Sequence, residues 1–231
     1  KEEWKDGREE EWKEGRMGAP IFHSSIPPTF QPSNLLCVKS FWGNLKHVER
    51  DHACQGGTRT MADVTLGKSK IHGIGVFATR DFNANETVLV IDDSRVVDDA
   101  HPLRPERGEY HYHCDYLAGG LVVLMPPPER HINSSCNPNT FTKTVDGVRH
   151  VIARRQIKAG EEITYDYIID CHGGDVWQCN CGSPRCRGTI VSSFFELPLE
   201  WQREYLPLLN DWFVEQHREK VEALRRKLIS L

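Results

Sequence analysis

Three cysteines stand close together near the end of the chain, at Cys179, Cys181 and Cys186. Thiolates at such short spacing are ligands that zinc prefers, and a structural zinc site usually takes four ligands in a tetrahedron. A disulfide framework is the alternative for a chain with eight cysteines, but such frameworks are typical of short secreted chains. The spacing therefore predicts a zinc site that lacks one ligand within this cluster.

The fourth ligand has to come from another part of the chain. Cys136 is one candidate, and it lies in the segment Asn133 to Asn139, whose asparagine and proline residues predict a tight turn. Cys171 and His172 lie nearer in the sequence and carry equally suitable ligand atoms. The residue types alone leave these three candidates open.

Composition excludes several classes of function. The net charge of the 231 residues is −4, which indicates no general attraction to nucleic acid or anionic lipid. The sequence has no apolar run long enough to span a membrane, and its N-terminus has neither a basic nor an apolar signal region. We expect a soluble, intracellular protein without direct nucleic-acid binding and without a membrane partner.

The regular part of the chain starts near residue 61. Residues 1–60 contain a repeated charged unit and many Pro and Gly residues, which predicts a disordered or linker N-terminal extension. Residues 92–118 are rich in Pro, Arg and Tyr and predict an insertion at the edge of the sheets. Short β-branched runs bounded by turn residues predict strands at 64–66, 75–79, 87–91, 120–124, 150–153 and 162–164.

The pattern becomes helical after residue 192. Apolar residues recur there at three- and four-residue steps, and Pro207 should start a second helix or kink the first. Val221, Leu224 and Leu228 then form one stripe among basic residues, which favours a helix that packs on its own domain. The alternative is a helix that binds a partner protein.

Four motifs, in this order, resemble those of the SET-domain protein lysine methyltransferases. They are Ile71 to Ala78, Arg130 to Asn139, Gly160 to Tyr167 and the cysteine cluster. The resemblance implies a mainly β fold with some α, in which small curved sheets surround a pseudoknot. It implies a SET domain at 61–170 with the insertion near 92–118, a post-SET zinc-binding segment at 171–192 and a C-terminal helical extension at 193–231.

The resemblance also implies the chemistry. Cys136 corresponds to the fourth ligand of a structural Zn²⁺ ion, beside Cys179, Cys181 and Cys186. The co-substrate would be S-adenosyl-L-methionine, and the substrate a lysine presented by a histone tail or another basic protein. Catalysis would consist mainly of aligning the methyl donor with a neutral amine away from water.

Two tyrosines correspond to the catalytic positions of the family. Tyr167 matches the catalytic tyrosine, whose hydroxyl faces the transferred methyl group, and Tyr165 matches the residue that limits how many methyl groups fit. A tyrosine at position 165 predicts mainly monomethylation. The residues expected to bind the donor are Gly73, Ile74, Gly75, Arg130, Asn133, Ser134, Tyr167 and Trp177.

Some of these assignments carry alternatives. Ser134 stands where the family usually has histidine, which weakens the expected donor binding. Trp177 is expected to cover the adenine or line the lysine channel, or else only to pack the cysteine cluster. Tyr112 is favoured over Tyr110 and Tyr116 as the tyrosine that faces the substrate.

Two functions compete with the enzyme. The first is a catalytically silent SET module that binds a peptide or partner, for which Ser134 is the support. The second is a zinc-stabilised interaction domain that uses its C-terminal helix. In a eukaryote we expect a nuclear protein, and in a prokaryote a cytoplasmic one.

Overall fold

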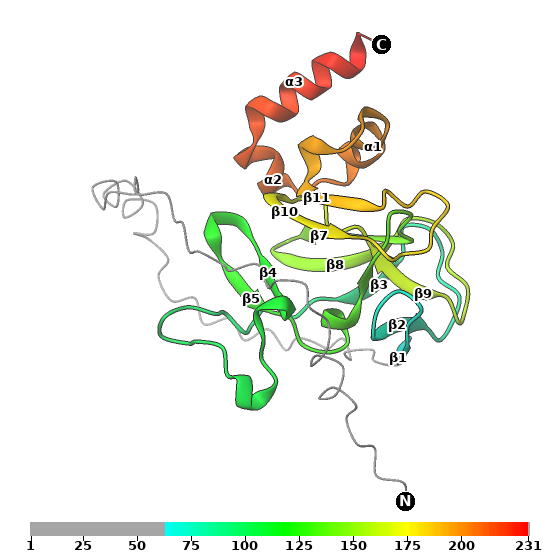
Figure 1. Ribbon diagram of the computed structural model, residues 1–231, viewed down its shortest axis with the longest axis vertical. Coiled ribbons are helices and arrows are strands. Elements are labelled where there is room, and N and C mark those ends of the chain that lie inside the picture. The colour runs from blue at the N-terminus through cyan, green and yellow to red at the C-terminus, as the bar shows by residue number, and fades with distance from the viewer. Residues whose placement is uncertain (1–62, 231) are drawn as a thin grey trace, which may run out of the picture. The chain divides into compact units, whose positions relative to one another are not determined.

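The computed structural model describes residues 63–230, so the predicted N-terminal extension lies outside the described residues. Small sheets and C-terminal helices make up this part of the chain (Figure 1). The strands are β1 (Val64–Lys68), β2 (Ile74–Ala78), β3 (Thr87–Val90), β4 (Cys114–Tyr116), β5 (Val122–Leu124), β6 (Asn133–Ser134), β7 (Thr140–Val145), β8 (Val148–Ala153), β9 (Glu162–Tyr165), β10 (His172–Gln178) and β11 (Thr189–Ser193).

Within residues 63–230 these strands form four sheets. Their strand orders are β1-β2-β9-β6, β3-β8-β7, β4-β5 and β10-β11. Most neighbours are antiparallel, and β7 and β8 form a hairpin that turns at Asp146 and Gly147, both with positive φ. The positive φ values suit a tight turn of this kind, in which glycine is favoured.

The helical elements are short. They are η2 (Pro105–Arg107), η3 (His111–His113), η4 (Ala118–Gly120), η5 (Glu129–His131), η6 (Phe194–Glu196), α1 (Leu199–Tyr205), η7 (Leu206–Leu208), α2 (Asp211–Gln216) and α3 (Arg218–Ile229). Pro198 is the N-cap of α1, and Pro207 lies in the first turn of η7, where the helix path breaks as expected.

The insertion carries two histidines in a turn. His111 and His113 lie in the 3₁₀ turn η3. His113 is buried beneath the ring of Tyr112, with ring centroids 4.4 Å apart, while His111 is exposed. Alternating aromatic and polar residues do not distinguish a strand from a turn over so few positions.

The parallel pair of β6 and β9 brings two distant segments together. Asn133 is opposite Thr164, and Ser134 is opposite Tyr165. Beside this pair, the buried side chain of Asn139 continues the hydrogen bonding of β9: its Nδ2 donates to Glu162 O at 2.8 Å, and its Oδ1 accepts from Thr164 N at 2.9 Å. The asparagine-rich turn therefore satisfies backbone hydrogen-bonding groups of β9 that a neighbouring strand would otherwise pair with.

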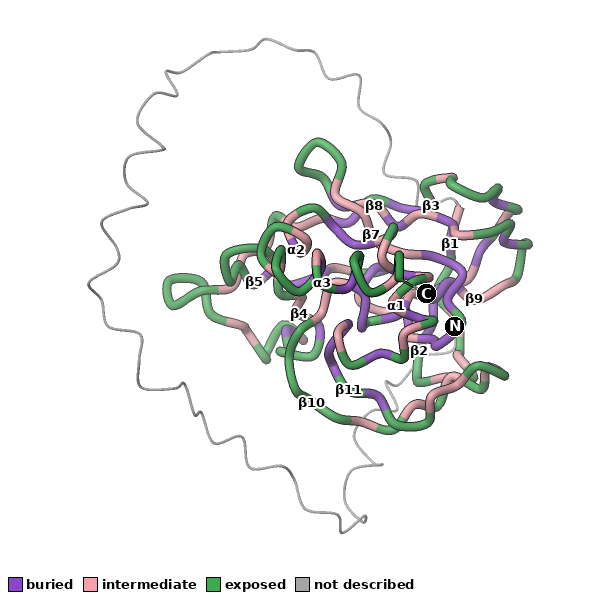
Figure 2. The backbone as a smooth tube through the Cα atoms, turned by 90° about the horizontal axis from the view of Figure 1, so that it is seen from above, coloured by how far each residue is buried: buried purple, intermediate pink, exposed green. Residues whose placement is uncertain are grey.

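Two hydrophobic clusters hold the described residues together. The buried stretches of the chain are purple in Figure 2. The first lies under β1, β2, β3, β8 and β9 and includes the fully buried Val76, Val151 and Ile163. The second joins the C-terminal helices to β11 and to the cysteine segment, and includes the fully buried Phe194 and Tyr205. The cysteine segment and the helices therefore depend on one shared core.

The C-terminal helices are fixed to the sheet by polar contacts. Asn210 Nδ2 donates to Thr142 O at 3.2 Å, and Asn210 Oδ1 accepts from Thr144 N at 2.6 Å. Lys143 Nζ donates to Leu209 O at 2.6 Å. Val221 and Leu224 of α3 are buried, and Leu228 packs against the same cluster. The apolar stripe of α3 thus packs on its own domain.

The carboxyl group of Asp170, which lies where the C-terminal helices meet the sheet, makes the free energy of unfolding depend on pH. Burial raises the pKa of Asp170 to about 6, although hydrogen bonds from Asn210 oppose the shift. Because the folded pKa lies above that of the unfolded chain, the stabilisation belongs to the protonated form and is lost as pH rises from about 4 through about 6. We expect this group to lower the free energy of unfolding by about 2 to 3 kcal/mol over that interval.

Urea unfolding of Asp170→Asn at pH 4 and pH 7 checks this expectation. The difference between parent and variant should change by that amount between the two pH values. Asp175→Asn, at an exposed position, is the control and should follow the parent. A parent and variant with parallel pH profiles would contradict the expectation.

Candidate active site and metal centre

A cavity of about 640 Å³ lies beside the two candidate catalytic tyrosines. Four of the residues predicted from the sequence line it: Tyr112, Arg130, Tyr165 and Tyr167. The other predicted donor-binding residues, Gly73, Ile74, Gly75, Asn133, Ser134 and Trp177, are not part of its lining. Tyr167 and Arg130 are therefore the two predicted donor-binding residues that line the cavity.

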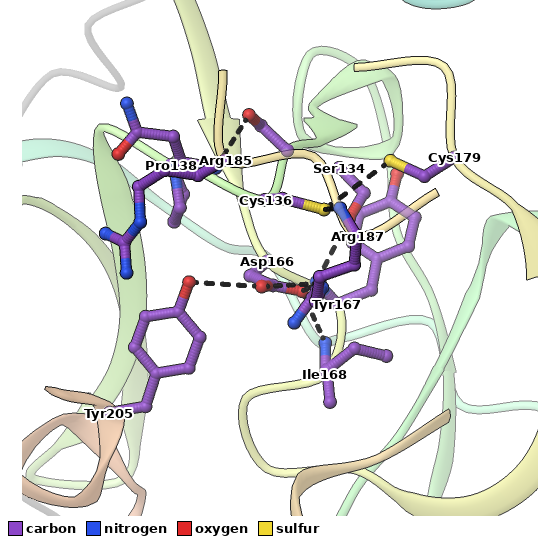
Figure 3. Close-up of polar contacts among 12 residues, drawn as sticks. Ser134, Cys136, Pro138, Asp166, Tyr167, Ile168, Cys179, Arg185, Arg187 and Tyr205 are labelled. Carbon is purple, nitrogen blue, oxygen red and sulfur yellow. Dashed lines mark hydrogen bonds and ion pairs between the residues drawn. The ribbon is translucent and has the colours of Figure 1, made fainter. Parts of the chain in front are cut away.

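The hydroxyl of Tyr167 has a fixed direction. It donates a hydrogen bond to Ile132 O at 2.7 Å. The backbone N–H of Tyr167 donates to Ser134 Oγ at 3.3 Å (Figure 3). The residue keeps 42% of its surface exposed along the cavity, but the protein around the hydroxyl raises its pKa to about 12, with a smaller contribution from the negative charge of Asp115. The hydroxyl is therefore protonated at neutral pH, and its oxygen lone pairs remain available to a positively charged group.

Tyr165 lies next to Tyr167, with ring centroids 5.1 Å apart. Its ring packs against the first hydrophobic cluster, and burial raises its pKa well above the usual value. Both tyrosines are thus neutral and suited to position groups rather than to remove protons. They lie two residues apart, one in the last position of β9 and the other just beyond it.

The glycine segment is held by a polar network that the sequence did not reveal. Asn133 Nδ2 donates to the backbone oxygens of His72 and Ile74 at 3.1 and 3.2 Å and to Glu162 Oε1 at 2.9 Å. Glu162 Oε1 also accepts from Ser69 Oγ at 2.7 Å. The side-chain N–H groups of Asn133 therefore hold the loop, and Glu162 is a positioning residue at its base.

The carboxylate of Glu162 leaves no room for a side chain at position 75, so this position requires glycine. A Cβ atom at position 75 would lie 2.4 Å from Glu162 Oε1, which no real contact tolerates. Gly73 has φ +49°, a conformation that favours glycine, and nothing lies within 4 Å of its Cβ position. One glycine thus makes room for Glu162, and the other permits the turn.

The four candidate zinc ligands come together. The sulfur atoms of Cys136, Cys179, Cys181 and Cys186 all lie within 4.8 Å of one another, and Cys136 Sγ is 3.7 Å from Cys179 Sγ. Tetrahedral zinc with Zn–S bonds of about 2.3 Å places its sulfurs about 3.8 Å apart. The cysteine cluster therefore fits a Zn²⁺ ion.

The backbone around the sulfurs supplies hydrogen bonds that metal-bound thiolates would accept. The backbone N–H groups of Arg187 and Gly188 donate to Cys136 Sγ and Cys186 Sγ, both at 3.4 Å. Burial raises the thiol pKa of Cys136 and of Cys179. At Cys181 burial acts in the same direction, but backbone N–H groups outweigh it and lower the pKa to about 7.

The other two candidate ligands lie elsewhere. Cys171 Sγ donates to Ser192 O at 3.3 Å, and His172 Nδ1 is 2.9 Å from Ser193 Oγ. Both residues line the cavity and do not belong to the cysteine cluster. Trp177, on β10, packs against the second hydrophobic cluster together with three of the cysteines. That placement supports the packing role of Trp177.

The tyrosines of the insertion differ in their position. Tyr112 and Tyr116 line the cavity and are 64% and 65% exposed, whereas Tyr110 does not line it. Tyr110 and Tyr112 stack with ring centroids 5.3 Å apart. The ring of Tyr112 is therefore held at the cavity wall by stacking on Tyr110. Tyr116 lines the same cavity and is exposed to a similar extent.

The C-terminal helices supply another part of the cavity wall. Trp212, Gln216 and His217 line it from α2 and the turn that follows. Helical periodicity identified Trp212 as part of a helix but not Gln216 or His217, and no motif connected the three residues with the tyrosines. Among residues 63–230, no helix is both long and apolar enough to span a lipid bilayer.

Comparison with known proteins identifies the part of the chain that carries the tyrosines. The SET domain family matches residues 73–168. The protein Histone-lysine N-methyltransferase trr of Drosophila melanogaster is 33% identical over 143 residues, which are 54% of this chain and 6% of that protein. Histone H3-lysine(4) N-trimethyltransferase ATX1 of Arabidopsis thaliana is 27% identical over 186 residues, which are 74% of this chain and 16% of that protein.

A third relative is named for a different lysine. Histone-lysine N-methyltransferase, H3 lysine-36 specific, of Mycosarcoma maydis is 28% identical over 167 residues, which are 66% of this chain and 16% of that protein. This chain therefore spans only a small part of the length of each of the three relatives.

Proposed function

Because residues 73–168 of this chain are a SET domain, we propose that the protein transfers a methyl group to the side-chain amine of a lysine in a protein substrate. The observation that carries the proposal is the direction of the Tyr167 hydroxyl. Its proton is donated to Ile132 O, so its oxygen remains available beside the cavity. The names of the three relatives, all lysine N-methyltransferases, support the same activity.

The chain's own residues would align the reaction. S-adenosylmethionine, when bound, supplies a methyl group on a positively charged sulfur. The lysine amine would first give a proton to water. Its lone pair would then take the methyl group, and the electrons of the broken carbon–sulfur bond would stay on sulfur, so that a neutral thioether leaves. The neutral oxygen of Tyr167 stabilises positive charge near the methyl group, and the Asn133–Glu162 network holds the glycine segment that we propose binds the donor.

The donor loop provides a direct test by substitution. In Gly75→Ala the new Cβ would press on Glu162 Oε1, so the loop or the carboxylate must move. Overpacking of this kind costs about 1 to 3 kcal/mol, and we expect donor affinity to fall by about 10- to 100-fold. Isothermal titration calorimetry with S-adenosylmethionine measures this change. Gly174→Ala, with open space around the Cβ position, is the matched control.

Tyr165 is proposed to limit the product mainly to monomethyl-lysine. Its side chain lines the cavity beside Tyr167, and we infer that its hydroxyl takes up space that an additional methyl group would need. In Tyr165→Phe we expect the dimethyl and trimethyl products to rise from minor species to the majority, with the rate of the first transfer changed less than about threefold. Mass spectrometry of the modified substrate checks this, and a parent that makes mainly trimethyl-lysine would contradict it.

The substrate is proposed to be a histone tail or another basic protein. The names of the relatives differ in the lysine that they specify, so they favour a histone without selecting a position. In a eukaryotic source the protein would then act in the nucleus, and in a prokaryotic source in the cytoplasm. Transfer of labelled methyl to a panel of histones and basic peptides tests the activity and the substrate together.

The alternative is a silent SET module that binds a peptide. Ser134 was the reason for it, but the Ser134 side chain contributes to the structure, because its Oγ accepts the backbone N–H of Tyr167. The serine at position 134 therefore helps to hold Tyr167 in place. This favours the enzyme over the silent module. A folded, zinc-loaded protein that binds S-adenosylmethionine and transfers no methyl group would favour the silent module.

A further inference from the structure

Arg187 lies between the cysteine cluster and the segment that carries Tyr167 (Figure 3). It follows Cys186 directly in the chain, and its side chain is only 11% exposed. Its Nη2 donates to Asp166 Oδ1 at 2.8 Å and is also 2.8 Å from Oδ2. The carboxylate of Asp166 is 0% exposed, and Asp166 immediately precedes Tyr167. One arginine therefore holds the residue next to the candidate catalytic tyrosine.

The same arginine also contacts the cysteine cluster. Its backbone N–H donates to Cys136 Sγ at 3.4 Å. Within the described residues, Nε and Nη1 of Arg187 are buried and have no hydrogen-bond partner. A Zn²⁺ ion with four thiolates is a net anion, and a buried cation beside it compensates that charge. The orphaned donors thus suit a metal-loaded cluster.

Asp166 depends on this arrangement. Besides Arg187, its carboxylate accepts from Tyr205 Oη at 3.2 Å and from Ile168 N at 3.2 Å. Arg187 is the cation of this buried set, and removing one partner of a buried pair leaves a charge that the interior does not tolerate. The segment would have to move to hydrate the carboxylate, and Tyr167 would move with it.

We propose that Arg187 is a positioning residue that makes the placement of Tyr167 depend on the metal-loaded cysteine cluster. The proposal rests on the role given above to Tyr167 and to the cluster. Zinc then controls the geometry of the reaction centre through one side chain, in addition to stabilising the cysteine segment. The connection runs from Cys136 through Arg187 and Asp166 to Tyr167, and each step is a contact described above.

Arg185 offers a matched control in the same loop. Its guanidinium also lies over the ring of Trp201, at 4.2 Å from the centroid compared with 5.0 Å for Arg187. Its ion pair is with Glu204, and its side chain is 40% exposed. Arg185 therefore shares the cation and the aromatic contact of Arg187 but not the contact with Asp166.

Hydrogen exchange of the backbone amides at residues 164–169, measured in the full chain with zinc bound and after chelation, tests the coupling without requiring activity. In the parent and in Arg185→Met, we expect zinc removal to speed this exchange by about tenfold or more. In Arg187→Met with zinc bound, exchange should already be fast, and chelation should change it by less than about twofold.

A second variant covers the case in which Arg187→Met binds no zinc. Asp166→Asn removes the buried charge and leaves Arg187 beside the cluster, and it should likewise lose the effect of zinc on residues 164–169. The proposal is overturned if chelation leaves exchange in the parent unchanged, or if a zinc-loaded Arg187→Met or Asp166→Asn keeps the parent's dependence.

Kinetics separate positioning from stability. We expect kcat of zinc-loaded Arg187→Met to fall by about 10- to 100-fold with KM and donor affinity nearly unchanged, and Arg187→Lys to recover part of the loss. A purely structural role would lower the melting temperature and the fraction of active protein without this pattern. If the parent transfers no methyl group, the proposed function fails, and the exchange measurements still decide whether Arg187 couples the two sites.

Discussion

Replacing Tyr167 by phenylalanine is expected to lower the rate of methyl transfer by about 10²- to 10³-fold, the usual cost of removing one preorganised polar group that stabilises the transition state. The variant keeps the ring and its packing and loses only the hydroxyl that donates to Ile132 O at 2.7 Å. Donor affinity should change little, because the Asn133 and Glu162 contacts at the donor loop remain. Single-turnover transfer from labelled S-adenosylmethionine measures the effect.

Tyr110→Phe is the control for this experiment. Tyr110 lies in the insertion, is 37% exposed and does not line the cavity, so its hydroxyl takes no part in the proposed reaction. We expect its kcat to stay within about threefold of the parent. If Tyr167→Phe retained full activity, the assignment of Tyr167 would be wrong.

Replacing Cys136 by serine should remove the bound zinc and a large part of the stability of the second hydrophobic cluster. Cys136 is 1% exposed, and as a zinc ligand its sulfur would tie β6 and the turn after it to the cysteine segment. Structural zinc contributes about 10 kcal/mol or more in small zinc domains, and even a loss of about 3 kcal/mol would lower the melting temperature by roughly 10 °C here. Methyl transfer should fall with zinc content.

Cys171→Ser is the matched variant for that measurement. Its sulfur donates to Ser192 O, a contact that a serine hydroxyl can keep, and it lies outside the cysteine cluster. Zinc per chain, determined by elemental analysis, should stay near one in Cys171→Ser and approach zero in Cys136→Ser. The reverse result would make Cys171 the fourth ligand.

The C-terminal helices connect these two predictions. The second hydrophobic cluster contains Phe213 of α2 and packs against three of the cysteines, while Trp212 of α2 lines the cavity. Loss of zinc should therefore disturb the packing of the C-terminal helices and of the cavity wall. This arrangement also shows why the C-terminal extension is not simply a surface for a partner.

Local sequence patterns determined a large part of the molecule. Strands with β-branched residues between turn signals were predictable because side-chain periodicity and turn chemistry act within a few residues. β10 (His172–Gln178) was not predicted, because two glycines and an aspartate give it a poor strand pattern. It becomes a strand by pairing with β11 across the cysteine loop.

The sequence by itself determined which residues are the candidates for the chemistry: the two tyrosines, the glycine segment and the three clustered cysteines, because each lies in a short motif with its own spacing. Only the tertiary structure decided which distant partners they meet. Cys136 joins the cysteines, and Glu162 occupies the space that Gly75 leaves. These contacts cross dozens of residues, so they follow from the parallel pairing of β6 with β9 and from the shared core, which no local pattern encodes.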